Sequence, residues 1–143
     1  MVSDNQRQLK PWLSIALVLT SAILLAAATQ LIDVANLVGI WEGESKCTIP
    51  TSPCQNEHVV YKIAADKSGP GKARVDAYKI VDSKQELMDT LDCTYRAGEI
   101  LDCTSNGSKK DRWEFRVGRD RMIGSLIVGD DRTLYRRLGL RKK

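Results

Sequence analysis

From Val38 to the end of the chain, apolar residues recur at every second position in short runs that turn residues separate. No stretch keeps a period of 3.6 residues over three helical turns. Alternation with a period of two places apolar side chains on one face of a β-strand, and clusters of Gly, Asp, Asn and Ser mark turns. The pattern therefore predicts that residues 38–143 form one domain that is nearly all β.

Eight strands are predicted in this domain. They are GIWEGESKC (39–47), EHVVYKIAA (57–65), KARVDAYKIV (72–81), a strand ending in TLDCTY (90–95), EILDC (99–103), DRWEFRV (111–117), RMIGSLIV (121–128) and RTLYRRLGL (132–140). Every link except 48–56 is short enough for a tight turn, so we expect an up-and-down antiparallel meander that closes into a small barrel. An alternative is that Ser83–Met88 forms a short helical turn, which leaves seven strands and a more open sheet.

The N-terminus has a different character. After Arg7 and Lys10, the run Trp12–Ala28 carries no charge and ends in three alanines. A basic start, an apolar run and small residues at its end are typical of a secretory signal peptide, so we expect a hydrophobic export helix in residues 1–28 that is removed after about Ala28. A retained membrane anchor is the competing interpretation, because 17 uncharged residues lie at the lower limit for spanning a bilayer. Residues 29–37 are assigned to a linker.

Four cysteines in a small exported chain predict a disulfide framework. Cys93 and Cys103 lie symmetrically about Gly98, so they face each other across a hairpin, and Cys47 is left to pair with Cys54. The spacings C-x6-C and C-x9-C are not those of zinc knuckles, and His58 is the only histidine. We therefore expect no metal site and no cofactor.

Charge and catalytic motifs restrict the function further. Without residues 1–28, 20 basic and 17 acidic side chains remain, a net charge of +3 that is too balanced to predict nucleic-acid binding. The basic residues after Asp131 are interpreted as a solvated end. His58 is the only candidate base for a nucleophile and falls on the outer face of its strand, so we expect no enzyme activity.

The step Gly39-Ile40-Trp41 on the first strand, with Arg136 on the last, resembles the signature of the lipocalins and the wider calycin group of ligand-binding barrels. The resemblance implies that Trp41 plugs one end of the barrel and that Arg136 lies across its ring. The stretch SPCQNEHVVY (52–61) is also similar to one in a group of uncharacterised small secreted bacterial domains.

Two functions are consistent with these features. The first is an exported, non-enzymatic binding or interaction module, periplasmic or secreted, that meets a protein partner through its charged outer face. The second is a lipocalin-like carrier that holds a small apolar ligand in the barrel mouth against Tyr61, Trp113 and Phe115. A membrane is expected as a partner only through residues 12–28, if they are retained. The volume of the interior separates the two, because a filled barrel has no room for a carried ligand.

Overall fold

The computed structural model describes residues 33–108 and 110–143. The predicted signal peptide or anchor in residues 1–28 lies outside the described residues, as does the first part of the linker 29–37. Among the residues that are described, no helix combines the length and the apolar character needed to cross a membrane.

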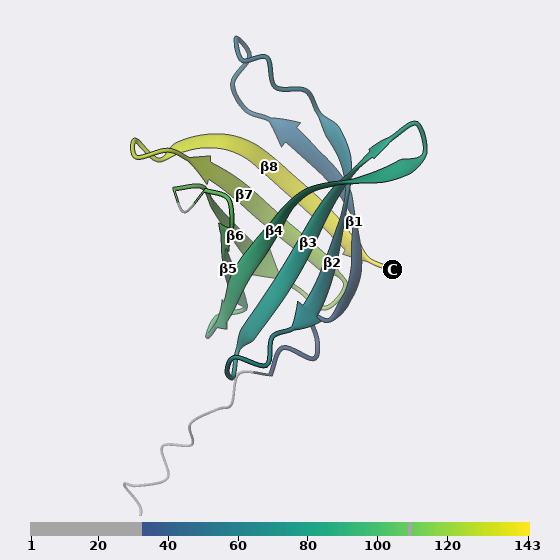
Figure 1. Cartoon of the computed structure of the whole chain (residues 1–143), viewed down its shortest axis with the longest axis vertical. Helices are drawn as coiled ribbons and strands as arrows, with labels where there is room; N and C mark the ends of the chain where they lie inside the picture. The colour runs from purple at the N-terminus through teal and green to yellow at the C-terminus, as the bar shows by residue number, and fades with distance from the viewer. Residues whose placement is uncertain (1–32, 109) are drawn as a thin grey trace, which may run out of the picture. The chain divides into compact units, whose positions relative to one another are not determined.

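Residues 39–142 form a closed barrel of eight antiparallel strands, as the alternation predicts (Figure 1). The strands are β1 (Gly39–Cys47), β2 (Glu57–Ala65), β3 (Lys72–Val81), β4 (Lys84–Arg96), β5 (Ile100–Ser105), β6 (Arg112–Val117), β7 (Arg121–Val128) and β8 (Thr133–Lys142). Each strand pairs with the next in sequence, and β1 pairs with β8, with Trp41 opposite Lys142 and Cys47 opposite Arg136. Closure leaves the sheet without a free edge along its main length.

The barrel has two ends, which we name after a residue at each. The Leu37 end carries the N-terminal turn 34–37 and the loops 66–71, 97–99 and 118–120. The Cys54 end carries the loops 48–56, 82–83 and 129–132, and residues 106–108 and 110–111 between β5 and β6.

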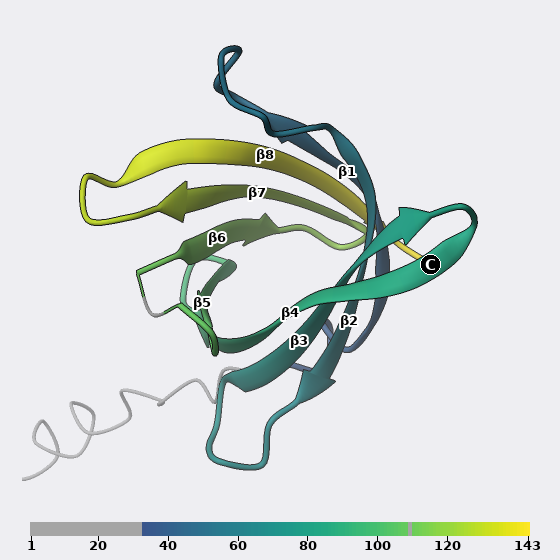
Figure 2. The ribbon, with the colours of Figure 1, turned by 45° about the horizontal axis from the view of Figure 1, so that its top comes forward.

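The hairpin of β3 and β4 extends beyond the barrel wall at the Cys54 end (Figure 2). The alternative of a helical turn at Ser83–Met88 is wrong, because β4 begins at Lys84 and the turn consists of Asp82 and Ser83, both with positive φ. Pairing shifts by one residue between Ala77 and Tyr78, so that Met88 is the extra residue of a β-bulge. A bulge bends a strand, and here the bend lies where the hairpin leaves the wall.

The interior of the barrel is filled by apolar side chains from all eight strands. Phe115 is fully buried, and a Cβ atom placed on Gly124 would lie 2.2 Å from its ring. Gly124 therefore provides the space that the ring occupies. Tyr61 packs edge-on against the same ring, with 5.9 Å between the ring centroids. These contacts leave the middle of the barrel solid.

Trp41 plugs the Leu37 end, but its cationic partner differs from the one expected. Its indole Nε1 donates a hydrogen bond of 2.8 Å to the carbonyl of Leu37, and Trp41 and Leu37 are both fully buried. The ammonium of Lys142 lies 5.6 Å from the Trp41 ring centre and donates to the carbonyl of Asn36 at 2.8 Å. The expected contact between Trp41 and Arg136 is wrong, because Arg136 pairs with Cys47, six residues and roughly 20 Å farther along β1.

Gly39 occupies a backbone position that favours glycine. Its φ is +137°, a conformation that side-chain-bearing residues rarely adopt. A Cβ atom here would also lie 3.2 Å from Cε of Lys142. The glycine thus allows Lys142 to cross β1 and reach the turn 34–37. Leu37, which was assigned to a linker, belongs to the core of the barrel.

Candidate functional site

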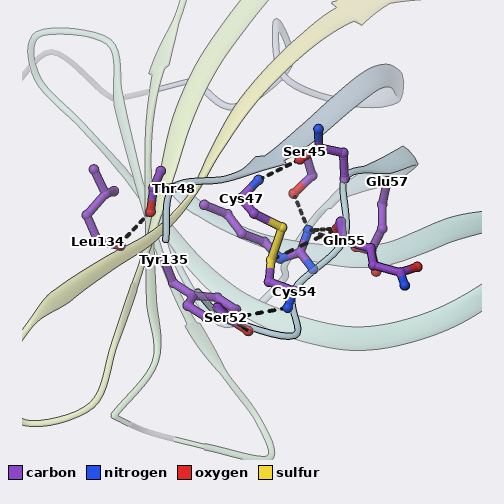
Figure 3. The surroundings of a disulfide bond; sticks show 11 residues. Ser45, Cys47, Thr48, Ser52, Cys54, Gln55, Glu57, Leu134 and Tyr135 are labelled. Carbon is purple, nitrogen blue, oxygen red and sulfur yellow. Dashed lines mark hydrogen bonds and ion pairs between the residues drawn. A yellow bond between two sulfur atoms is a disulfide. The ribbon is translucent and has the colours of Figure 1, made fainter. Parts of the chain in front are cut away.

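Both predicted disulfides are present. Cys93 and Cys103 face each other on β4 and β5 and are buried, while Cys47 and Cys54 close the loop after β1. The Cys47–Cys54 bridge is drawn in Figure 3. The backbone N–H of Cys47 donates to Oδ1 of Asn56 at 2.9 Å. The pairings confirm the hairpin register deduced from the position of Gly98.

Two hydrogen bonds attach this loop to β8. Thr48 donates from its hydroxyl to the carbonyl of Leu134 at 2.7 Å (Figure 3). Its backbone N–H also donates to the carbonyl of Tyr135 at 3.1 Å. The disulfide and these bonds hold one wall of the Cys54 end in place.

Arg136 connects the same loop to the barrel interior. Its Nη1 lies 3.0 Å from the carbonyl of Gln55, 3.3 Å from Oγ of Ser45 and 3.2 Å from Oε2 of Glu57. The side chain is only 14% exposed, so the ion pair with Glu57 compensates for the loss of water around its charge. Arg136 therefore acts as a structural cation of the Cys54 end.

A cleft of about 260 Å³ opens at this end, above the filled interior. Its apolar wall includes Tyr61, Trp113 and Tyr135, and Met88 from the bulge of β4 lies at its side. Of the three residues expected to line a ligand site, Tyr61 and Trp113 line the cleft. Phe115 does not, because it is packed below them against Gly124.

The polar lining of the cleft is mainly acidic. Glu57, Asp89 and Asp111 lie around it with one cation, Arg136, which is already paired with Glu57. Asp89 accepts a hydrogen bond of 2.7 Å from the backbone N–H of Thr90. Within residues 33–108 and 110–143, neither Asp89 nor Asp111 forms an ion pair. The cleft therefore presents negative charge beside aromatic rings.

Tyr61 is a neutral phenol in this environment. Burial raises the pKa of its hydroxyl, and the carboxylates of Glu57 and Asp89 raise it further, although the Trp113 indole and the Arg136 charge act in the opposite direction. A buried hydroxyl that stays protonated can serve as a hydrogen-bond donor or acceptor but not as an anion.

The remaining reactive groups lie elsewhere or are bonded. His58 is on the outer face, where Nε2 lies 2.7 Å from Oε1 of Glu42. This hydrogen bond, with that from Lys143, lowers the pKa of the Glu42 carboxyl. All four cysteines are in disulfides. In the part of the chain that the structure describes, no three His, Cys, Asp or Glu side chains are grouped so that they could hold a metal ion.

No protein-family model, curated protein or solved structure matches the chain. The cleft itself was only partly visible in the sequence. Alternation identified Tyr61 and Trp113 as inward residues. Asp89 on β4 and Asp111 just before β6 share the inward parity of their runs, but parity does not show that the two carboxylates line one opening. Met88 is the extra residue of the β-bulge, which alternation does not predict.

Proposed function

We propose that this chain is an exported, non-enzymatic binding module whose binding site is the cleft at the Cys54 end. Its ligand is a small molecule with an apolar body and a positive charge. The observation that carries this proposal is the combination of Trp113, Tyr61 and Tyr135 with the carboxylates of Asp89 and Asp111 around one opening.

The size of the cleft supports a small ligand. A volume of about 260 Å³ lies just below the usual range for small-molecule sites, about 300–1,000 Å³. Phe115 and Gly124 fill the barrel below, which argues against a carrier that encloses its ligand in the interior. A single ring with a short side chain matches the space available.

The chemistry of the lining supports a cation. Aromatic faces attract cations through their quadrupole, by about 0.5–2 kcal/mol depending on how much water is removed. Asp89 and Asp111 add attraction for positive charge, and Arg136 opposes it little because Glu57 neutralises it. An extracytoplasmic location is supported by the two disulfides, which persist in oxidising compartments.

The test compares three probes that share one ring and differ in charge: 2-phenylethylamine, 2-phenylethanol and phenylacetate. We expect calorimetric titration at neutral pH to rank the amine above the alcohol and the alcohol above the acid. Replacing Asp89→Asn together with Asp111→Asn should reduce affinity for the amine by roughly tenfold, or about 1.4 kcal/mol, and leave the alcohol nearly unchanged. Glu114→Gln, which removes a carboxylate from the outer face, is the matched control. Equal affinity for amine and acid would contradict the proposal, as would the absence of binding by all three.

The projecting hairpin favours a second candidate, a protein-interaction module. Val81, Leu87 and Met88 are 36%, 57% and 40% exposed on β3 and β4. Exposed apolar side chains grouped on one element are typical of contact surfaces. Cross-linking in the native host tests this candidate. A cross-linked partner that Leu87→Ser loses and Asp89→Asn retains would favour the hairpin over the cleft.

A further inference from the structure

A group of arginines lies on the outer face of β6, β7 and β8. We call Arg116, Arg121, Arg137 and Arg141, with Ile123 among them, the arginine patch. All four arginines are exposed, and Ile123 is 60% exposed, which is the largest exposure among the large apolar side chains of the described residues.

The register of the strands places like charges together. Arg121 lies directly opposite Arg141 across β7 and β8, and like charges in directly opposed positions destabilise a sheet. On its other side Arg141 faces Glu42, but the two oxygens of that carboxylate are engaged by His58 at 2.7 Å and Lys143 at 3.0 Å.

None of the four arginines has an ion-pair partner among residues 33–108 and 110–143. Other arginines of the barrel do have one: Arg112 binds Asp102 at 3.0 Å, and Arg136 binds Glu57. The four side chains of the patch thus keep their positive charge, unlike Arg112 and Arg136.

A hollow lies beside the opposed pair. A Cβ atom on Gly139 would meet no atom within 4 Å, and the space of about 290 Å³ around it is lined by Arg121, Ile123, Gly139, Leu140 and Arg141. Guanidinium groups bind the oxygens of a phosphate with two parallel hydrogen bonds. The hollow therefore has the size and the donors for a phosphodiester, with an apolar side chain beside it.

We propose that the arginine patch is a docking surface for a bilayer that contains anionic phospholipid. A lipid phosphate lies in the hollow at Gly139 between Arg121 and Arg141, and Ile123 enters the interfacial region of the bilayer. The exposed isoleucine distinguishes this partner from a nucleic acid, whose phosphates would surround Ile123 with charge. This proposal does not depend on the cleft at the Cys54 end.

The path of the chain agrees with this surface. Arg116, Arg121 and Arg141 lie toward the Leu37 end, where Lys142 holds the turn 34–37 through the carbonyl of Asn36. In the sequence, four residues, 29–32, separate the uncharged run that ends at Ala28 from Asp33. Three arginines of the patch therefore lie toward the end of the barrel at which the described residues begin.

The test measures partition of the full chain into vesicles of phosphatidylcholine with and without phosphatidylglycerol. The ratio of the two partition coefficients reports the charge effect of the whole chain, including Arg7 and Lys10. Comparison of this ratio between wild type and variants isolates the patch, because residues 1–28 are the same in all of them. We expect the triple substitution Arg116→Gln, Arg121→Gln and Arg141→Gln to lower this ratio by about fivefold for each arginine. The matched control Lys67→Gln, Arg74→Gln and Lys84→Gln removes the same charge from the opposite side of the barrel and should change the ratio little.

Three results would overturn the proposal. The first is a wild-type ratio close to one, and the second is an equal fall in the patch and control variants. The third is that a DNA oligonucleotide displaces the chain from phosphatidylglycerol vesicles and binds through the same three arginines. Thermal melts of all variants establish that the exposed substitutions leave the barrel folded.

Discussion

Trp41 is the side chain whose removal we expect to destabilise the barrel most. It is fully buried, and its indole N–H bonds to the carbonyl of Leu37 at 2.8 Å. Burying an aromatic side chain of about 150–250 Å² at about 25 cal/mol per Å² stabilises the fold by about 4–6 kcal/mol. Partial collapse of the surroundings reduces the loss, so we expect Trp41→Ala to lower the free energy of unfolding by about 3–5 kcal/mol. Urea denaturation followed by far-ultraviolet circular dichroism, with the disulfides intact, measures this change.

A double-mutant cycle tests which cation belongs to Trp41. Lys142→Met combined with Trp41→Leu should show a coupling energy of about 0.5–1 kcal/mol, because both substitutions remove the same cation–π contact. Arg136→Met combined with Trp41→Leu should be additive within about 0.5 kcal/mol, because the two sites share no contact. Coupling of Trp41 to Arg136 that equals or exceeds its coupling to Lys142 would refute the assignment of the Leu37 end.

Other substitutions test the filled interior, the buried disulfide and an ion pair on the outer face. Gly124→Ala places a methyl group 2.2 Å from the Phe115 ring and should lower the free energy of unfolding by about 1–3 kcal/mol in denaturation experiments. Adding Phe115→Leu should restore part of this loss, and strictly additive effects of the two substitutions would contradict the packing. Replacing Cys93 and Cys103 by alanine should cost about 2–4 kcal/mol, and a melting temperature like that of the wild type would argue against the bridge. Because the pKa of Glu42 is lowered from 4.5 in the folded chain, its carboxylate stabilises the fold above that pH, and the contribution is lost as the pH falls through the folded pKa. The wild type should therefore have a higher melting temperature than Glu42→Gln at neutral pH, and the two melting temperatures should become equal in acid. A difference that persists in acid would show that the stabilisation has a cause other than this carboxylate.

Local sequence pattern determined most of the fold. In β6 the alternation of DRWEFRV places Trp113, Phe115 and Val117 inward, and the structure buries all three. The hairpin around Gly98 fixed the partner of Cys93 in the same way. These predictions succeed because each depends only on side-chain parity and on the nearest turn.

Side-chain parity shows which face of a strand a residue lies on, but not how far along the barrel axis it lies. Arg136 and Lys142 share one face of β8, so the alternation alone does not decide which of them reaches Trp41. The stagger of β1 against β8 decides it, and β8 also shifts register against β7 between Leu126 and Ile127. Phe115 was placed at the ligand site for the same reason, since it shares its face with Trp113 but lies deeper.

Segments outside the strands were the other source of error. Leu37 precedes the first alternating run, so its burial against Trp41 had no periodic signal.

The arginine patch could not be predicted from the sequence either. Arg121 and Arg141 are distant in sequence, and only the pairing of β7 with β8 brings them together.

The seam between β1 and β8 has a consequence for the order in which the chain becomes a barrel. The strand that completes the sheet is β8, Thr133–Lys142, which follows the other seven strands in the chain. Until those residues emerge, β1 and β7 each expose a row of unpaired backbone groups, which are the groups that strands of other chains can bind. The contact between β1 and β8 has the greatest sequence separation, so it forms last, and the barrel cannot close before β8 is available. A chain truncated before Thr133 should consequently aggregate rather than fold, even though it retains seven strands and both disulfides.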